Sequence, residues 1–348
     1  MLLQSPFYEF QRAHGAVFKR YDPLSYELPS HFGSAEEEYT EMVRSCVAID
    51  FSHYGYLKIT GKHALDFLNR MSTNDLNKLY ENKSAATVLT NDKGRIIDLI
   101  GVNRQTDGLY VITSPGTHEK IMQWLDKYII MDDVHIQNLS EQTIHLGFIG
   151  PRSAEILKSI SGTELAGQDQ IVTLMLDGQT IVITRSIQLG TGFTITANIS
   201  AKTALWNLIL SKNIPLCGMD AYTSARIEQK KPLIGNELSE KYNPLESGLQ
   251  HAVSFTKGCY IGQEVIARLD SYNKIQKHLV QLQSKESIPE GAKIYTDNKE
   301  IGVITSSTHS YKYRQNVALG YVKTEFINVS NVLVSTTSEK PITAEFCP

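Results

Sequence analysis

The sequence predicts an α+β protein in which two related halves of mixed sheets and helices precede a small carboxy-terminal β-barrel. The order strand, helix, three strands, helix occurs twice before residue 275. After that point the pattern changes to short alternating strands separated by turns, and no low-complexity linker divides the chain. We therefore expect one region over 1–275, with halves at approximately 1–140 and 141–275, and a barrel over 276–348.

The first half contains six predicted elements. They are a strand over 56–60, a helix over 62–71, strands near 86–91, 94–103 and 109–113, and a helix from Pro115 to about Ile129. Ser114 is suited to cap this last helix, and Pro115 is suited to its first position. Its apolar stripe comprises Ile121, Trp124, Leu125 and Tyr128.

The second half repeats this order. Its predicted elements are a strand over 144–148, a helix over 151–160, strands over 171–176, 180–185 and 192–197, and a helix over 200–211. Asp107-Gly108 and Asp177-Gly178 occupy comparable hairpin turns in the two halves. The strands expected in the barrel include 278–282, 301–304 and 332–334.

Composition is that of an ordinary globular protein. Of 348 residues, 41% are hydrophobic and 20% are charged. No apolar run approaches the roughly 18 residues of a membrane helix, and no secretion signal is recognisable, so we expect a cytoplasmic protein without a membrane partner. The formal net charge of −3 argues against a general nucleic-acid-binding protein. Four widely separated cysteines form neither a disulfide framework nor a paired metal-ligand motif, so no metal site is predicted.

The octet Lys257-Gly258-Cys259-Tyr260-Ile261-Gly262-Gln263-Glu264 is the most informative stretch of the sequence. It places a thiol between two glycines and beside a lysine, whose charge favours the reactive thiolate. Cys46, by contrast, lies in an apolar run that is typical of a buried cysteine. Two interpretations stay open: a functional thiol at Cys259, assisted by Lys257, and a tight turn before a strand in which the thiol is incidental.

The octet closely resembles the K-G-C-Y-x-G-Q-E signature of the YgfZ-type folate-binding proteins, a branch of the aminomethyltransferase (glycine-cleavage T-protein) superfamily. Further segments resemble that superfamily in order and spacing, from about residue 10 to about residue 275. They are His14–Ala16, Leu57–Gly61, Phe67-Leu68, Thr73–Asp75, Gly147–Pro151, Leu216–Ala221, Arg226–Glu228, Gly235–Leu238, Pro244–Glu246 and Gly248-Leu249. The resemblance implies a T-protein-like fold and tetrahydrofolate, or a derivative, as the ligand.

Asp98 is a lone acid between apolar residues on a predicted buried strand, Gly94–Ile100. A carboxylate in that setting is suited to proton transfer or charge stabilisation. The alternative is an acid on the solvent side of an antiparallel strand. The resemblance implies that Asp98 matches the catalytic, folate-binding aspartate of a G-x-I-x-D segment, although the second acid often present there is Leu99 here.

Arg226 and Glu228 stand two residues apart, which would place them on one face of an extended segment. They form a simple salt bridge in one interpretation. In the other, the resemblance implies that Glu228 accepts hydrogen bonds from the pterin edge and that Arg226 helps to orient the site. Tyr242 and Tyr260 are both candidates for apolar walls of the folate site.

One departure from the superfamily concerns the T-G-Y-T-G-E-x-G-F-E segment that helps to build the substrate pocket. The corresponding run here, residues 185–194, lacks the tyrosine and both acids. The resemblance therefore favours a YgfZ-like protein that binds tetrahydrofolate and acts in assembly or repair of iron–sulfur proteins, and thereby in tRNA modification. A folate-dependent aminomethyltransferase and a non-catalytic, folate-responsive scaffold for iron–sulfur proteins are the alternatives, so whether the chain is an enzyme stays open.

Overall fold

The computed structural model describes residues 3–21, 26–164, 167, 169–187, 189, 192–272, 274–329, 331–335 and 341–347. The chain forms two compact units. One contains Met1–Thr87 and Leu99–Tyr222, and the other contains Val88–Asp98 and Thr223–Pro348. The tip of one hairpin of the first unit's sheet thus belongs to the second unit.

The amino-terminal segment of the first unit forms a small sheet with two helices. The sheet has the order β1-β3-β2, and its strands are β1 (Leu3–Gln4), β2 (Val17–Tyr21) and β3 (Tyr26–His31). The helices are α1 (Tyr8–Ala13) and α2 (Ala35–Arg44). Ser34 caps α2 by accepting a hydrogen bond from the amide of Glu37, which satisfies one of the free donors of the first turn.

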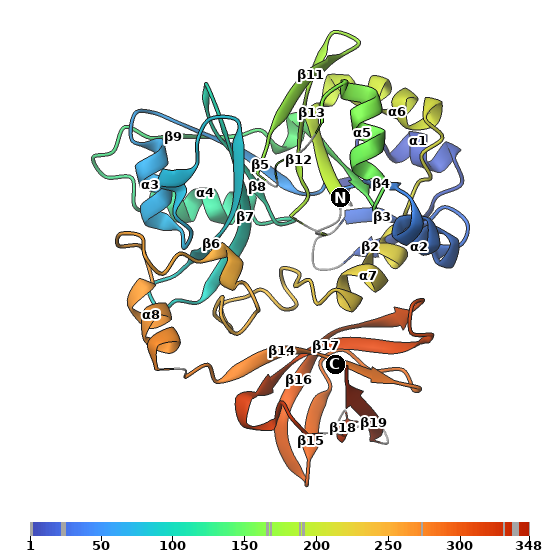
Figure 1. Ribbon diagram of the computed structural model, residues 1–348, viewed down its shortest axis with the longest axis vertical. Coiled ribbons are helices and arrows are strands. Elements are labelled where there is room, and N and C mark those ends of the chain that lie inside the picture. Colours follow the sequence, from blue (N-terminus) through green and yellow to red (C-terminus); the bar gives the residue numbers. More distant parts are fainter. Residues whose placement is uncertain are drawn as a thin grey trace. The chain divides into compact units, whose positions relative to one another are not determined.

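In the two larger sheets of the first unit, whose elements are labelled in Figure 1, four strands are arranged in the same order, whereas the fifth strand follows them in the chain in one sheet and precedes them in the other. The first, β6-β7-β8-β5-β9, and its helices comprise β5 (Gly55–Thr60), α3 (Ala64–Met71), β6 (Lys83–Thr90), β7 (Ile96–Gln105), β8 (Gly108–Thr113), α4 (His118–Asp126) and β9 (His135–Asn138). The second, β11-β12-β13-β10-β4, comprises β4 (Val47–Asp50), β10 (Thr143–Ile149), α5 (Ser153–Ser161), β11 (Val172–Leu176), β12 (Gln179–Arg185), β13 (Gly192–Asn198) and α6 (Lys202–Ser211). The predicted repetition is confirmed.

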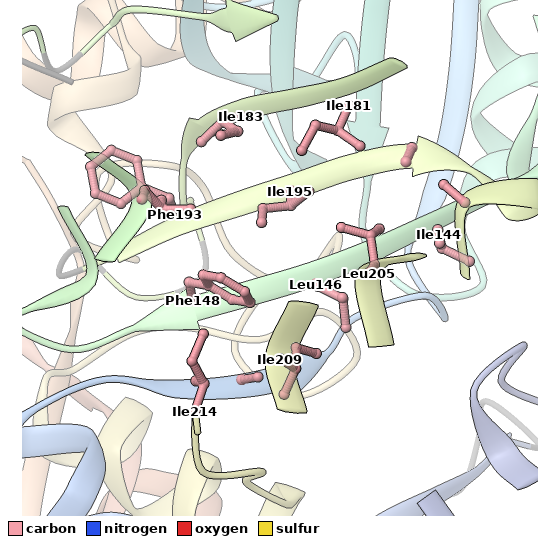
Figure 2. Packing of buried hydrophobic residues seen from close by; sticks show 14 of the residues in the cluster. Ile144, Leu146, Phe148, Ile181, Ile183, Phe193, Ile195, Leu205, Ile209 and Ile214 are labelled. Atoms are coloured by element: carbon pink, nitrogen blue, oxygen red, sulfur yellow. The ribbon is translucent and has the colours of Figure 1, made fainter. Parts of the chain in front are cut away.

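A hydrophobic core joins the second sheet to its helices (Figure 2). Alternate residues of the strands face this core, because side chains alternate between the two faces of a strand. They include Ile144, Leu146 and Phe148 of β10, with Ile181 and Ile183 of β12 and Phe193 and Ile195 of β13. Leu205 and Ile209 of α6 pack against them at helical spacing.

The second unit contains the closed barrel β14-β17-β16-β15-β18-β19, as predicted. Its strands are β14 (Lys277–Ser284), β15 (Lys293–Thr296), β16 (Lys299–Ser310), β17 (Gln315–Lys323), β18 (Asn331–Ser335) and β19 (Ile342–Phe346). Two helices precede it in the chain, α7 (Met219–Glu228) and α8 (Gln263–Ser271). Within the described part of the chain, no helix is both long and apolar enough to cross a membrane.

Candidate functional site

Residues 257–262 of the octet form an irregular turn, and its last two residues begin α8. The element after the turn is therefore a helix and not the strand of one interpretation, and the role of the thiol stays a prediction. Gly262 immediately precedes α8 and has a φ of 82°, a conformation that favours glycine. Cys259 is exposed to solvent. Lys257 is only 8% exposed, and its Nζ lies 5.2 Å from the centroid of the Tyr260 ring, within the range of a cation–π contact.

Tyr260 supports the octet from the protein interior. Its side chain is buried in a cluster with Leu245, Val253 and Ile266, the last of which belongs to α8. This burial raises the pKa of the Tyr260 phenol to about 12, so the hydroxyl is neutral at physiological pH. The visible role of Tyr260 is to pack the octet against its surroundings, and its contact with folate stays a prediction.

Asp98 lies in the interior of β7 and is completely buried. Strand alternation places it on the same face as Ile96 and Ile100, which are also completely buried. The alternative in which this acid faces solvent is therefore wrong. Leu99, which stands where the superfamily segment often has its second acid, lies on the opposite face of the strand and is half-buried.

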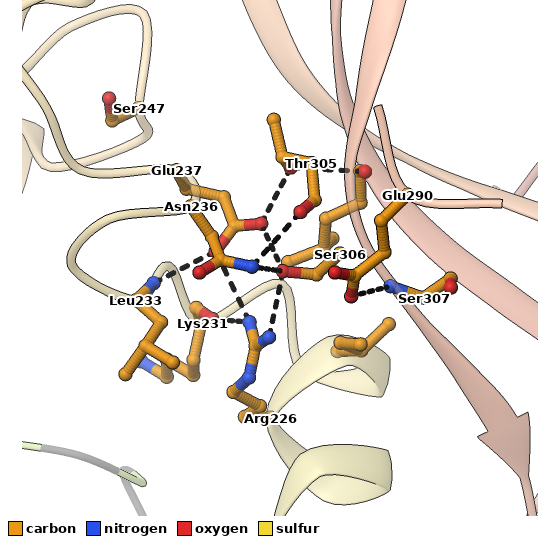
Figure 3. Close-up of polar contacts among 12 residues, drawn as sticks. Arg226, Lys231, Leu233, Asn236, Glu237, Ser247, Glu290, Thr305, Ser306 and Ser307 are labelled. Atoms are coloured by element: carbon orange, nitrogen blue, oxygen red, sulfur yellow. Dashed lines mark hydrogen bonds and ion pairs between the residues drawn. The ribbon is translucent and has the colours of Figure 1, made fainter. Parts of the chain in front are cut away.

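Arg226 belongs to a buried polar network that attaches α7 to the barrel (Figure 3). Its Nη1 lies 3.2 Å from Oε2 of Glu237, and its Nη2 donates to Oγ of Ser306 on β16 at 2.8 Å. Glu237 also accepts hydrogen bonds from the hydroxyls of Ser306 and Thr305, each at 2.6 Å. The guanidinium therefore binds the protein's own carboxylate, as in the salt-bridge interpretation, but the acid is Glu237 and not Glu228.

Glu228 is the last residue of α7, and the helix directs its side chain away from that of Arg226. The expectation that the two share one face rested on an extended segment, whereas residues two apart on a helix point in different directions. Oε1 of Glu228 accepts hydrogen bonds from Ser310 of β16 at 2.5 Å and from Ser224 at 3.0 Å. The amide of Lys312 also donates to this oxygen, at 3.5 Å.

Sequence reasoning assigned no role to Glu237 or to Thr90. Glu237 lies in the Gly235–Leu238 segment that resembles the superfamily, and this was the only signal for it. Thr90 is completely buried at the end of β6, and its hydroxyl donates to the carbonyl of Ile261 in the octet at 2.7 Å. No local pattern predicts this contact, because the two residues are 171 positions apart.

The run over 185–194 that departs from the superfamily is described only in part. Gln188, Gly190 and Thr191 lie outside the described residues. Thr194, which stands where the superfamily segment ends in an acid, is 1% exposed and pairs with Gly147 and Thr184 in the second sheet. An uncharged hydroxyl therefore occupies this interior position.

A shallow hollow of about 360 Å³ lies in the first unit, at the end of the first large sheet. It is lined by Thr60–Lys62, Ala64, Leu65, Glu81 and Arg104–Leu109. None of the predicted site residues lines this hollow. Among the described residues, no group of three His, Cys, Asp or Glu side chains is placed to hold a metal ion.

The chain is similar to proteins of one family along nearly its whole length. Residues 7–257 match the family described as the GCVT N-terminal domain, and residues 277–348 match the glycine cleavage T-protein C-terminal barrel domain. A candidate chloroplastic transferase of Arabidopsis thaliana is 30% identical over 87% of this chain and 71% of its own length. An aminomethyltransferase of Geobacillus sp. (strain WCH70) is 29% identical over 94% of this chain and 92% of its own length.

A solved structure has the same fold. It is the glycine cleavage system aminomethyltransferase T of Bartonella henselae, with a TM-score of 0.88, coverage of 100% of this chain and 97% of that one, and 23% sequence identity. The α+β fold with its carboxy-terminal barrel, predicted from the sequence, is thus confirmed.

Proposed function

Because the chain belongs to the glycine cleavage T-protein family, we propose that it binds tetrahydrofolate or a derivative and acts in folate-dependent one-carbon transfer. The observation that carries this proposal is the match of both family domains, which together span residues 7–257 and 277–348. The names of relatives such as the Geobacillus aminomethyltransferase favour a transferase.

The chemistry of the predicted site residues fits a reduced folate. The pterin ring offers a donor edge and a titratable nitrogen, and carboxylates are the natural partners of both. Two carboxylates of the second unit would carry these tasks: Asp98, which is completely buried, and Glu228, which is half-buried and accepts from Ser310. Arg226 would contribute by fixing α7 to the barrel, through Glu237 and Ser306.

Bound tetrahydrofolate would supply the nitrogen that accepts or donates the one-carbon unit. In this proposal Asp98 holds or moves the proton at that step, because a carboxylate positioned beside a reacting nitrogen can act as a general acid or base. Glu228 holds the donor edge of the ring, and Tyr260 supports the wall of the site. The uncharged Thr194 indicates that the one-carbon donor differs from that of relatives with an acid there.

A second candidate function is favoured by the exposure of Cys259. A solvent-exposed thiol on a turn, next to a glycine with nothing within 4 Å of its Cβ position, is accessible to a protein partner. This arrangement, with the octet's resemblance to YgfZ-type proteins, favours a thiol-dependent role in assembly or repair of iron–sulfur proteins and thereby in tRNA modification. The folate-responsive scaffold would bind iron–sulfur proteins without any chemistry at Cys259. For each of these candidate functions we propose a cytoplasmic location.

Paired variants distinguish these functions. The assays are turnover of an aminomethylated carrier or methylated amine with tetrahydrofolate, and recovery of activity in a client iron–sulfur enzyme. Transfer requires Asp98, so Asp98→Asn should abolish turnover while Cys259→Ser should leave it unchanged. The reverse pattern in the client-enzyme assay would replace transfer by the thiol-dependent function. A stable client complex with full activity in both variants would identify the scaffold.

A further inference from the structure

The β6–β7 hairpin carries Asp98 and also touches the octet that carries Cys259. Its portion from Val88 to Asp98 lies in the same compact unit as the octet. Oγ1 of Thr90, near the end of β6, donates to the carbonyl oxygen of Ile261 at 2.7 Å. Thr90 is completely buried, so water cannot replace this hydrogen bond without opening the structure.

A second contact joins the hairpin turn to the start of α8. A Cβ added to Gly262 would lie 2.5 Å from the carbonyl oxygen of Asn91 and 2.9 Å from Cα of Gly94. Both neighbours are backbone atoms, so neither can rotate away. A Cβ added to Gly94 would in turn lie 3.2 to 3.3 Å from Ile266, Val265 and the carbonyl of Gly262. The two glycines therefore let two backbones approach each other closely.

The hairpin also contacts the segment that contains Tyr242 and Glu246. The amide of Ile96 donates to the carbonyl of Tyr242 at 3.0 Å. Nη1 of Arg95 lies 3.3 Å from Oε2 of Glu246. The hairpin is thus in contact both with the octet and with this segment, and Asp98 lies only two residues beyond Ile96 on the same strand.

We propose that this hairpin couples the position of Asp98 to the position of the Cys259 turn, so that the two move together. Thr90 and Gly262 are the positioning residues. Ligand binding at Asp98 then changes the reactivity of the Cys259 thiol, and modification of the thiol changes ligand affinity by the same factor, because coupling between two sites is reciprocal. This inference rests on the proposed function, in which Asp98 contacts the folate.

The test measures the rate at which iodoacetamide alkylates Cys259 in the Cys347→Ser background, with the site identified by mass spectrometry. Cys46 and Cys217 are only 1% and 2% exposed and react slowly. Thr90→Val removes the hydroxyl and keeps the shape of the side chain. We expect it to speed alkylation about fivefold, the factor that corresponds to one lost hydrogen bond of ~1 kcal/mol. Thr90→Ser keeps the hydroxyl and should react at the wild-type rate.

Thr113→Val is the matched control, because Thr113 is also completely buried in a strand but lies in the other unit. It should react like the wild type. Equal rates in folded Thr90→Val and wild-type protein would overturn the inference. Should Thr90→Val fail to fold, hydrogen exchange of the unsubstituted hairpin provides the test. Alkylation of Cys259 should then change exchange at the Ile96 amide, and unchanged exchange would overturn the inference.

A second arm adds 5-formyltetrahydrofolate, a stable reduced folate, whose binding is measured separately by calorimetry. If it binds, it should change the alkylation rate in the wild type and leave the rate in Thr90→Val unchanged. An equal response in both proteins would refute the coupling and leave the proposed function intact. Absence of binding in the calorimeter would refute the proposed function. The coupling through the hairpin would then be decided by the alkylation rates of wild type and Thr90→Val without ligand.

Discussion

Arg226 and Glu237 form an ion pair that is almost completely shielded from solvent. The side chains are 4% and 0% exposed, and Nη1 lies 3.2 Å from Oε2. This pair connects the end of α7 to β16, because Ser306 contacts both partners. The barrel is thereby attached to the helix that ends in Glu228, and Ser310 adds a second attachment four residues along the same strand.

Removing the arginine should destabilise the protein strongly. In Arg226→Met, the Glu237 carboxylate keeps its hydroxyl donors but loses its only cationic partner among the described residues. Breaking one side of a buried pair typically costs about 3–5 kcal/mol. Urea unfolding measures the loss. The control is Arg12→Met, which breaks an exposed pair with Glu9 and should change stability by less than about 1 kcal/mol. Similar losses of stability in both variants would contradict the stabilising role of the buried Arg226–Glu237 pair.

Removing the hydroxyl of Tyr321, whose ring stacks on that of Tyr242, should destabilise the protein less than removing Arg226. Their centroids are 3.4 Å apart at 12°, and the Tyr321 hydroxyl donates to the Glu237 carbonyl at 2.9 Å and contacts Ser247 at 2.6 Å. Tyr321→Phe keeps the stack but removes the hydroxyl that donates to the Glu237 carbonyl, whereas Ser247 still donates to the carbonyl of Asn243 at 3.1 Å. The lost hydrogen bond should lower the free energy of unfolding by about 1–3 kcal/mol, and thermal unfolding measures this loss. An unchanged melting temperature would mean that another group satisfies the Glu237 carbonyl.

Two buried imidazoles predict a loss of stability in acid. Burial lowers the pKa of His53 and of His145 to about 3, and repulsion from His145 contributes at His53. The unfolded chain titrates near 6.5, so between these values it binds more protons than the folded protein. Their stabilising contribution is complete above about pH 6.5 and is lost as pH falls towards 3. Each imidazole contributes a slope of about 1.4 kcal/mol per pH unit.

His145→Leu isolates one of these contributions. Buried Asp50 opposes the histidines, because burial raises its pKa and acid therefore favours its folded form. The difference between wild type and variant removes this common background. Unfolding at pH 7.5 and pH 5 should show a smaller acid loss in His145→Leu than in the wild type. Parallel losses would mean that burial does not lower the pKa of His145 in the folded protein.

Much of the architecture could be predicted from the sequence, because the signals are local. The Asp107-Gly108 turn marked the hairpin of β7 and β8, and the Asp177-Gly178 turn marked the hairpin of β11 and β12. The helix expected from Pro115 to Ile129 is shorter, His118–Asp126, and its predicted stripe is divided: Ile121 and Leu125 are buried, whereas Tyr128 is 39% exposed. Residues before 56 gave no assigned element, yet they supply β4 to the second sheet.

The candidate site was harder to predict, because its contacts join distant positions. The two-residue spacing of Arg226 and Glu228 suggested a shared face only on the assumption of a strand, and α7 removes that premise. The partners of Arg226 are 11 and 80 positions away. The contact between Thr90 and Ile261 likewise depends on packing within the second unit, which no local pattern encodes.

The most direct test of the proposed function is calorimetric titration of the purified protein with tetrahydrofolate under reducing conditions. Glu228→Ala and Ser310→Ala are measured in parallel, because the latter removes the hydrogen bond to the barrel and keeps the carboxylate. We expect binding by the wild type and Ser310→Ala, and a loss of affinity of at least about tenfold in Glu228→Ala, since hydrogen bonds to a charged group contribute about 1.5–3 kcal/mol. Absence of binding in the wild-type protein would contradict the proposed function.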